Sequence, residues 1–364
     1  MNVQSICEII EEFAPLALQE SYDNAGLLIG DPQMEVKGIL ICIDITRDIL
    51  EEAIQKKCNF ILSHHPLIFK PLLRIIEQNE VQKCAAIAIK NNLAIYAAHT
   101  NLDNVWQGVN FKIAEKIQLQ NIQVLRPMTH RLLKLVTFVP KSYSVTVRNA
   151  LFEAGAGTIG NYNCCSFNSE GTGTFMANEQ ANPFIGEINE LHTEPEIRME
   201  MILPDYLKNR VQAALLKVHP YEEPAYDFIS LENEWNRVGA GIIGNLLSPQ
   251  EELDFLREIK ATFNNPVIKY TKLLGKKISK IAICGGAGSS FLADAIQKQA
   301  DVYISSDFKY HDFFLAEDKI LIADIGHFES EQFTKEIFYE IITKKIPNFA
   351  VQISDINTNP VNYL

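Results

Sequence analysis

The chain has 364 residues, of which 47% are hydrophobic and 21% charged, and its formal net charge is −12. This length predicts about two domains, and the acidic balance argues against a nucleic-acid-binding surface, which is basic. No uninterrupted apolar run reaches the roughly 18 residues of a transmembrane helix, and the N-terminal stretch MNVQSICEIIEEFAPLALQE lacks the basic start and apolar core of a signal peptide.

The seven cysteines are odd in number, scattered along the chain and never spaced as a CxxC pair. This pattern indicates reduced thiols, and neither a disulfide framework nor a thiolate zinc site. We therefore expect a cytoplasmic protein with no membrane partner, and nucleic acid is not expected as a partner.

Three apolar runs in the first third of the chain end abruptly in polar residues. They are GILICIDIT, CNFILSHHP and LAIYAAHTNLD, which end at Thr46, Pro66 and Asp103. Helical patterns lie between them, over Arg47 to Lys57 and Glu80 to Lys90. Strands that alternate with helices predict an α/β fold with a parallel sheet covered on both faces.

The middle of the chain, from about Leu132 to Glu232, has a different pattern. In order, it predicts strand LVTFVP, helix YSVTVRNALFEAG, strand NYNCCSF, a glycine-rich polar stretch, strand IRMEMILP, helix YLKNRVQAALLKV and strand AYDFISL. The order βαββαβ is typical of a ferredoxin-like module. We predict a domain over residues 128–235, inserted into a discontinuous α/β domain made of residues 1–127 and 236–364.

The pattern of the first third returns near the C-terminus, in ISKIAICGGAGSS, ADVYISSDFKYHD and KILIADIGHFESE. Aligned by order, CNFILSHHPLIFK corresponds to ADVYISSDFKYHD, and LAIYAAHTNLD corresponds to KILIADIGHFESE. In the second pair each run ends in a histidine that is followed four residues later by an acid, His99 by Asp103 and His327 by Glu331. The same offset in both runs indicates two related α/β halves.

His64 and His65 stand side by side at the end of a predicted strand. Consecutive side chains of a regular strand point to opposite faces, so such a pair could not converge on one ligand. Pro66 breaks the strand because it lacks an N–H group. We therefore expect both imidazoles to reach one site.

Ligands in open α/β sheets lie beyond the carboxyl ends of the strands. All candidate donors follow such strand ends, so we expect them at one rim. They are His64 and His65 after one strand, His99 and Asp103 after another, and His327, Glu329 and Glu331 after a third.

Imidazoles and carboxylates without cysteine suit Zn, Mn, Fe, Ni or Co, and suit neither Ca nor an iron–sulfur cluster. The candidates outnumber the three protein ligands of a catalytic zinc, whereas two ions bridged by a carboxylate would use them. We predict two divalent metal ions per chain, with Zn, Fe and Mn as the first choices.

Other histidines and two glycine-containing stretches have plainer interpretations. We interpret His130, His192 and His219 as structural, and leave His311 open between a structural role and a role behind the metal ligands. CGGAGSS is neither a P-loop nor a dinucleotide fingerprint, so we expect a tight turn. DNAGLLIGD is interpreted as a turn-rich entry to the first strand.

Five stretches of the chain together resemble the GTP cyclohydrolase 1 type 2 homologue family, also called the Nif-three-like dinuclear metal-centre proteins. They are SYDNAGLLIG, SHHPLIF, AAHTNLDN, ICGGAGS and GHFESE. The resemblance covers about residues 1–127 and 236–364. The middle segment, with NALFEAGAGTIGNYNCCSF, GTGTF and HPYEEPAYD, is similar to the insert of the longer bacterial members, which resembles CutA and PII signalling domains.

The resemblance implies a particular ligand set. His65 and Asp103 would bind one metal, His64 and His327 would bind the other, and Glu331 would bridge them. His99 would lie in or just outside this ligand set. The resemblance further implies a homo-oligomer, a hexameric toroid.

Our leading functional prediction is a metal-dependent hydrolase of a small nucleotide-like or phosphorylated substrate, with His99 as general acid or base. The alternative is a metal-dependent regulatory or metal-handling protein without turnover, which a PII-like insert favours. A third interpretation, a ring that encircles DNA, is opposed by the net charge of −12.

Overall fold

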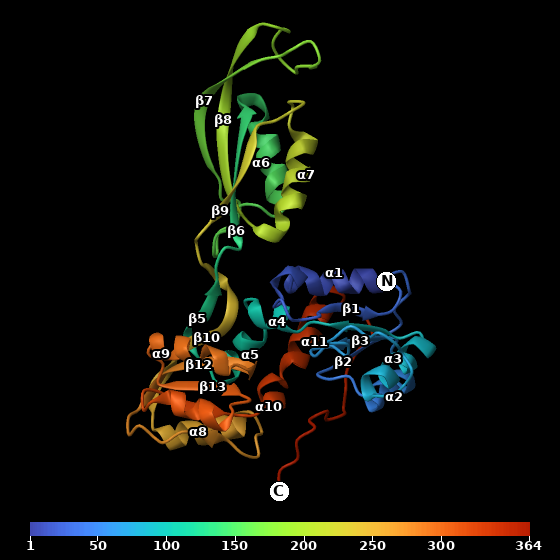
Figure 1. The fold of residues 1–364 in the computed structure, drawn as a ribbon, viewed down its shortest axis with the longest axis vertical. Helices are drawn as coiled ribbons and strands as arrows, with labels where there is room; N and C mark the ends of the chain where they lie inside the picture. The colour runs from blue at the N-terminus through green and yellow to red at the C-terminus, as the bar shows by residue number, and fades with distance from the viewer. The chain divides into compact units, whose positions relative to one another are not determined.

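The computed structural model describes residues 1–364, the whole chain. The chain divides into two compact units, the first formed by residues 1–126 and 237–364 and the second by residues 127–236. It is a mixed α/β structure with three sheets (Figure 1). No helix is both long enough and apolar enough to cross a membrane.

The first sheet of the first unit has five strands, and four of them are parallel. In spatial order the strands are β1 (Gly26–Ile29), β4 (Ala94–Ala97), β3 (Phe60–Ser63), β2 (Ile39–Cys42) and β15 (Val351–Ile353). Only β1 is antiparallel to its neighbour, β4. Every residue of β2, β3 and β4 is buried, as expected of strands covered on both faces.

The second sheet repeats the strand order of the first. In spatial order its strands are β11 (Lys269–Tyr270), β14 (Leu321–Asp324), β13 (Val302–Ser306), β12 (Ile278–Ala287), β10 (Trp235–Gln250) and β5 (Gln120–Met128). β12, β13 and β14 are parallel, as β2, β3 and β4 are. A short antiparallel strand, β11 or β1, borders each set on the same side.

The predicted parallel pairing is therefore confirmed for the central strands of both sheets, whereas three other strands depart from it. β1, β10 and β11 are antiparallel to their neighbours. β1 has four residues and β11 has two, which is too short to give a periodic pattern in the sequence.

Helices cover both faces of the two sheets. They are α1 (Val3–Phe13), α2 (Arg47–Gln55), α3 (Glu80–Lys90), α4 (Thr100–Asn104), α5 (Val109–Lys116), α8 (Glu252–Thr262), α9 (Leu292–Gln297), α10 (His327–Glu331) and α11 (Thr334–Lys345). The helix α1 shows why these segments fold so: Val3, Ile6 and Ile10 form one buried stripe, and the Asn2 side chain caps the first turn.

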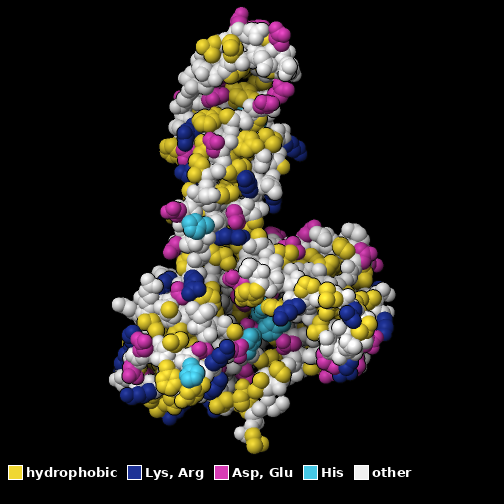
Figure 2. Space-filling model, viewed as in Figure 1, with side chains coloured by type: hydrophobic (Ala, Val, Ile, Leu, Met, Phe, Trp, Pro, Cys, Tyr) yellow, Lys and Arg dark blue, Asp and Glu magenta, His cyan; other side chains and the backbone are white.

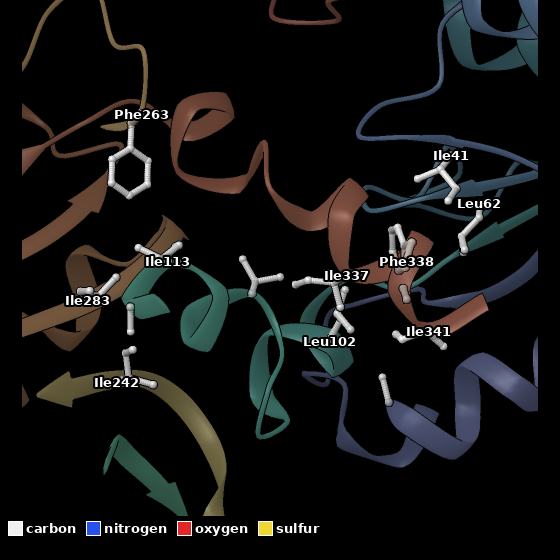
Figure 3. Close-up of a cluster of buried hydrophobic side chains, with 14 of the residues drawn as sticks. Ile41, Leu62, Leu102, Ile113, Ile242, Phe263, Ile283, Ile337, Phe338 and Ile341 are labelled. Atoms are coloured by element: carbon white, nitrogen blue, oxygen red, sulfur yellow. The ribbon is translucent and has the colours of Figure 1, made fainter. Parts of the chain in front are cut away.

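One hydrophobic core joins the two halves of the first unit. Alternate residues of both sheets, such as Ile41 and Ile283, belong to it together with residues of α1, α5, α8 and α11 (Figure 3). The intervening strand residues face outward, where α2 and α3 cover the first sheet and α9 covers part of the second. The shared core fixes the strand ends of the two halves relative to each other.

The second unit is a four-stranded antiparallel sheet with two helices on one face (Figure 1). Its elements in chain order are β6 (Leu132–Pro140), α6 (Ser144–Glu153), β7 (Phe167–Met176), β8 (Leu191–Pro204), α7 (Lys208–Val218) and β9 (Tyr226–Leu231). The strands lie in the order β7-β8-β6-β9. Leu135 and Met201 of the sheet pack against Val147 and Leu215 of the helices.

One predicted strand of this unit is wrong. The segment NYNCCSF, which we expected to form a strand, is mostly irregular, and Cys164 has a positive φ of 58°. The strand is instead β7, in the glycine-rich polar stretch that follows. β7 was missed because Gly171 and Gly173 remove the apolar alternation by which a strand is recognised.

Candidate metal centre

Two adjacent histidines follow the end of β3. His64 and His65 come directly after Ser63, and Pro66 stops the strand there. The backbone N–H of His65 donates to the Ile43 carbonyl at 2.9 Å, which holds this turn against the end of β2. The two imidazole centroids lie 4.9 Å apart, so both rings reach the same region.

Two short helices after β4 and β14 carry the other candidate donors. α4 follows His99 and contains Asp103, and α10 begins at His327 and ends at Glu331. Residues four apart share a helix face, and His327 Nε2 lies 3.1 Å from Glu331 Oε2. The repeated offset therefore positions one carboxylate beside the histidines in each half.

The Glu331 carboxylate lies in the middle of these donors and is almost fully buried. Its Oε2 lies 3.0 Å from His65 Nε2 and 3.1 Å from His327 Nε2. Its Oε1 lies 3.6 Å from His64 Nε2. The two oxygens of one carboxylate thus face two different groups of donors.

The distances between the other candidate donors show which of them lie next to each other. His65 Nε2 lies 3.3 Å from His327 Nε2, and His64 Nε2 lies 3.8 Å from Asp103 Oδ1. The resemblance implies the opposite pairing, with His65 beside Asp103 and His64 beside His327. The difference arises because α10 brings His327 against the more exposed of the two adjacent rings, that of His65.

Unpaired polar atoms show that this group fits a metal. His64 Nε2 and Asp103 Oδ1 are buried and have no hydrogen-bond partner. Buried polar atoms are normally paired, and an unpaired one costs about 1–3 kcal/mol. Nitrogen and carboxylate donors of this kind suit divalent transition metals. Two sets have ligand atoms within 4.8 Å of one another: His64, His65 and His99, and His65, His327 and Glu331.

The donor group is open to solvent on one side. The His327 side chain is 37% exposed, whereas that of His64 is fully buried. Figure 2 shows histidine side chains gathered at the surface in the middle of the first unit. A small molecule can therefore reach the His327 side of the group.

Three aspartates that sequence reasoning missed hold the histidines from behind. Asp44 lies 2.7 Å from His65 Nδ1, Asp23 lies 2.8 Å from His99 Nδ1, and Asp307 lies 2.6 Å from His327 Nδ1. Carboxylates in this position fix the tautomer and orientation of a metal-binding imidazole. The fourth ring, His64, has the Ala98 carbonyl at 2.9 Å from its Nδ1 instead.

Asp23 also corrects an interpretation made from the sequence. The stretch DNAGLLIGD does lead into β1, but its first residue, Asp23, accepts hydrogen bonds from the backbone N–H and the hydroxyl of Thr100 and lies 2.8 Å from His99 Nδ1. Burial opposes ionisation of Asp23, but these hydrogen bonds outweigh burial and lower its pKa to about 2. The stretch is therefore part of the site as well as a turn.

Two imidazoles of the group have strongly raised pKa values. Burial opposes protonation of both, yet their carboxylate partners raise the pKa of His65 to about 10 and that of His327 to about 11. Burial lowers the pKa of His64, so this ring is neutral and its Nε2 is free to bind a metal. Burial and the Glu331 charge raise the pKa of Asp103.

Gly286 makes room for the Glu331 carboxylate. Its φ is +63°, and a Cβ built on it would collide with Glu331 Oε1. The stretch CGGAGSS, expected to be a tight turn, is in fact the end of β12 followed by a short 3₁₀ helix. The stretch forms a wall of the site, which the sequence did not reveal.

The remaining candidates lie elsewhere. Glu329 is buried beside the C-terminal segment, where it accepts a hydrogen bond from Asn359 at 2.9 Å. His311 is exposed, and its ring lies beside those of Tyr310 and Phe314. The ring of His219 lies 3.0 Å from the Phe138 carbonyl in the second unit, where it has a structural role.

Known proteins match the chain over its full length. A family model described as Duf34/NIF3 (NGG1p interacting factor 3) matches residues 1–360. The GTP cyclohydrolase 1 type 2 homolog of Halalkalibacterium halodurans is 39% identical, covering 100% of this chain and 99% of the relative, and that of Staphylococcus epidermidis is 37% identical, covering 100% of each. A crystal structure of a Bacillus cereus protein related to NIF3 superposes with a TM-score of 0.87 at 36% identity, covering 100% of this chain and 99% of the other.

Proposed function

The chain belongs to the Duf34/NIF3 family, and from this premise and the donor geometry we propose that it binds two divalent metal ions and hydrolyses a small nucleotide-like or phosphorylated substrate. The observation that carries the proposal is the position of Glu331. Its two carboxylate oxygens face different donors, His64 on one side and His65 with His327 on the other. Such a carboxylate can bridge two ions.

We assign the ligands by the distances. His65 and His327 would hold one ion together with Glu331 Oε2, and His64 and Asp103 would hold the other together with Glu331 Oε1. Zn, Fe and Mn accept this mixture of imidazole and carboxylate ligands. Bound ions would lower the pKa of water and neutralise negative charge on the substrate.

His99 is proposed as the general acid or base. Its Nδ1 is held by Asp23 at 2.8 Å, which leaves Nε2 to accept or release a proton. It belongs to the same group of donors as His64 and His65, so a substrate at the metals would lie within its reach. Asp23 has the role of the group that orients a catalytic imidazole.

The substrate class follows from charge and from the relatives. The name of the relatives, GTP cyclohydrolase 1 type 2 homolog, suggests a nucleotide. The chain carries a net charge of −12, which alone would repel a phosphate. Two divalent cations reverse that sign locally, so a phosphorylated substrate is compatible with the site.

The second candidate function is a metal-dependent regulatory or metal-handling protein without turnover. It is favoured by the second unit, whose βαββαβ order and β7-β8-β6-β9 sheet agree with the proposed ferredoxin-like, CutA/PII-like inserted domain. We keep as proposals the domain bounds, 128–235 within 1–127 and 236–364, the hexameric toroid and the cytoplasmic location. All seven cysteines are free thiols, in agreement with a reducing compartment.

A substrate screen distinguishes the two functions. Protein loaded with one defined metal is incubated with nucleotides and other phosphorylated compounds, and products are detected by mass spectrometry. We expect turnover in the wild type and in Glu329→Gln, whose carboxyl group accepts a hydrogen bond from Asn359, and none in Glu331→Gln. Absence of turnover with every metal, in protein that holds two ions, would favour the regulatory function.

A further inference from the structure

The second unit contains a hollow of about 850 Å³ that the metal centre does not explain. It lies against the face of the sheet opposite α6 and α7. Met199 and Met201 of β8 pack toward the helices, whereas the alternate residues Glu196 and Arg198 line the hollow. The loop around Phe184 closes its other side.

Two glycines keep the floor of this hollow clear. Gly171 and Gly173 lie two positions apart in β7, and therefore on the same face, opposite Glu196 and Glu194 of β8. A Cβ at Gly171 would meet no atom within 4 Å, and one at Gly173 would collide with the Glu196 carboxylate. Neither glycine has the positive φ that would require glycine, so Gly171 leaves open space in the hollow and Gly173 makes room for the Glu196 carboxylate.

Aromatic rings form the walls. Phe138, Phe175, Phe184 and Tyr221 all line the hollow. The ring of Tyr221 lies 5.9 Å from that of Phe175 and 6.5 Å from that of Phe184, centroid to centroid. Walls of this kind bind flat or apolar groups, and their faces attract cations.

The carboxylate of Glu196 lies at the hollow without a countercharge. Its Oε1 accepts a hydrogen bond from the Tyr221 hydroxyl at 2.8 Å, and no basic side chain forms an ion pair with it. Arg198, the basic residue at the hollow, is paired with Glu200 at 2.9 Å. Glu222 and Glu223 also line the hollow, so it disfavours anions such as nucleotides.

We propose that this hollow binds a planar organic cation. The flat part of the ligand lies between the aromatic walls and above Gly171, and its amidinium, guanidinium or amine group donates hydrogen bonds to Glu196. A carboxylate anchored by a tyrosine in an aromatic pocket recognises both the charge and the hydrogen-bond donors of such a group. This site is independent of the proposed metal centre.

Three probes of matched shape test the proposal on the full-length protein. Benzamidine, benzamide and benzoate differ in charge but hardly in size, and their binding is measured by isothermal titration calorimetry and saturation-transfer NMR. We expect benzamidine to bind at least about tenfold more tightly than the other two, a difference of about 1.4 kcal/mol. Equal binding of the three, or no binding of benzamidine at millimolar concentration, overturns the proposal.

Variants locate the probe. Glu196→Gln keeps the shape of the side chain and should weaken benzamidine binding at least about tenfold, and Gly171→Leu should fill the hollow and abolish binding. The control is Glu190→Gln, an exposed carboxylate outside the hollow, which should bind as the wild type does. Circular dichroism verifies the folding of each variant.

The same variants test whether another molecule of the chain occupies the hollow instead. Unchanged benzamidine affinity in folded Glu196→Gln overturns the proposal. A second copy of the chain would occupy the hollow if the wild type binds no probe and Gly171→Leu forms a smaller assembly than the wild type. That pair of results overturns the proposal. Native mass spectrometry provides this measurement.

Discussion

His65 and His327 are 262 residues apart in the chain, yet their Nε2 atoms lie 3.3 Å apart. Each ring is held from behind by an aspartate, His65 by Asp44 and His327 by Asp307. Both Nε2 atoms also face the same oxygen of Glu331. When no metal is bound, the imidazole nitrogens of this group hold protons. A divalent cation that binds these nitrogens can replace the protons.

Metal binding should therefore release protons. The pKa of His65 is about 10 and that of His327 about 11, so both rings are protonated at pH 8 in the protein without metal. A metal can bind their Nε2 atoms only after these protons leave, and we expect at least one proton released per chain. Calorimetric titration with Zn²⁺ in buffers of different ionisation enthalpy measures the number. Release of none would show that these rings are not ligands.

The same groups should make the stability of the protein without metal depend on pH. Both folded-state pKa values lie above the unfolded value of about 6.5. Their stabilisation is therefore complete below about pH 6.5 and is lost as the pH rises through about 10 for His65 and about 11 for His327. Thermal unfolding in the presence of chelator should give a Tm that falls between about pH 8 and pH 11. The fall should be smaller in Asp307→Asn, and an equal fall would contradict the assignment.

Asp307 should contribute to metal affinity without touching the metal. Asp307→Asn keeps the size of the side chain but weakens its hold on His327 Nδ1, 2.6 Å away. Loss of such a partner typically lowers metal affinity about 10–100-fold. The control is Asp318→Asn, an exposed residue with positive φ, a conformation that asparagine tolerates. Competition with a fluorescent chelator measures both affinities, and equal values would count against the role of Asp307.

The site should require Gly286 because a larger residue would collide with the Glu331 carboxylate, and not only because the backbone of Gly286 has a positive φ. Gly286→Ala places a methyl group against the Glu331 carboxylate, whereas Gly275→Ala, at a similar φ of +71°, meets no atom within 4 Å. Both changes cost about 1 kcal/mol or more for the left-handed backbone. We expect only Gly286→Ala to lose metal, as measured by elemental analysis of the folded variants. Full metal content in Gly286→Ala would refute this reasoning.

The second unit should fold alone. Residues 127–236 have their own core, in which Leu135, Met199 and Met201 of the sheet pack on Val147 and Leu215 of the helices. A protein of these residues should unfold cooperatively in urea. A non-cooperative transition would show that this core depends on the rest of the chain.

The proximity of the candidate donors could be predicted from the sequence because parallel strands place their carboxyl ends at one rim. This reasoning found His64, His65 and His327, and the offset of four found Glu331 beside His327. Which candidate donors lie next to each other could not be found in this way. It depends on how the two halves pack on their shared core, a contact between residues more than 200 positions apart.

Other features were missed for local reasons. Asp44 and Asp307 each follow a parallel strand by one or two residues, which is a usable signal, but single aspartates in loops are common. Asp23 precedes β1, where the strand-end rule does not apply. β7 was missed because its glycines leave space for the hollow and so lack the apolar alternation of a strand.

The bridging role of Glu331 is tested most directly by metal titration of Glu331→Gln beside the wild type, with Glu329→Gln as the control on the same helix. Removing the charge and one ligating oxygen should weaken both ions together, because each carboxylate oxygen faces a different donor group. The wild type and Glu329→Gln should each bind two ions per chain. Loss of one ion from Glu331→Gln, with the other at wild-type affinity, would make Glu331 a terminal ligand and contradict the bridged centre.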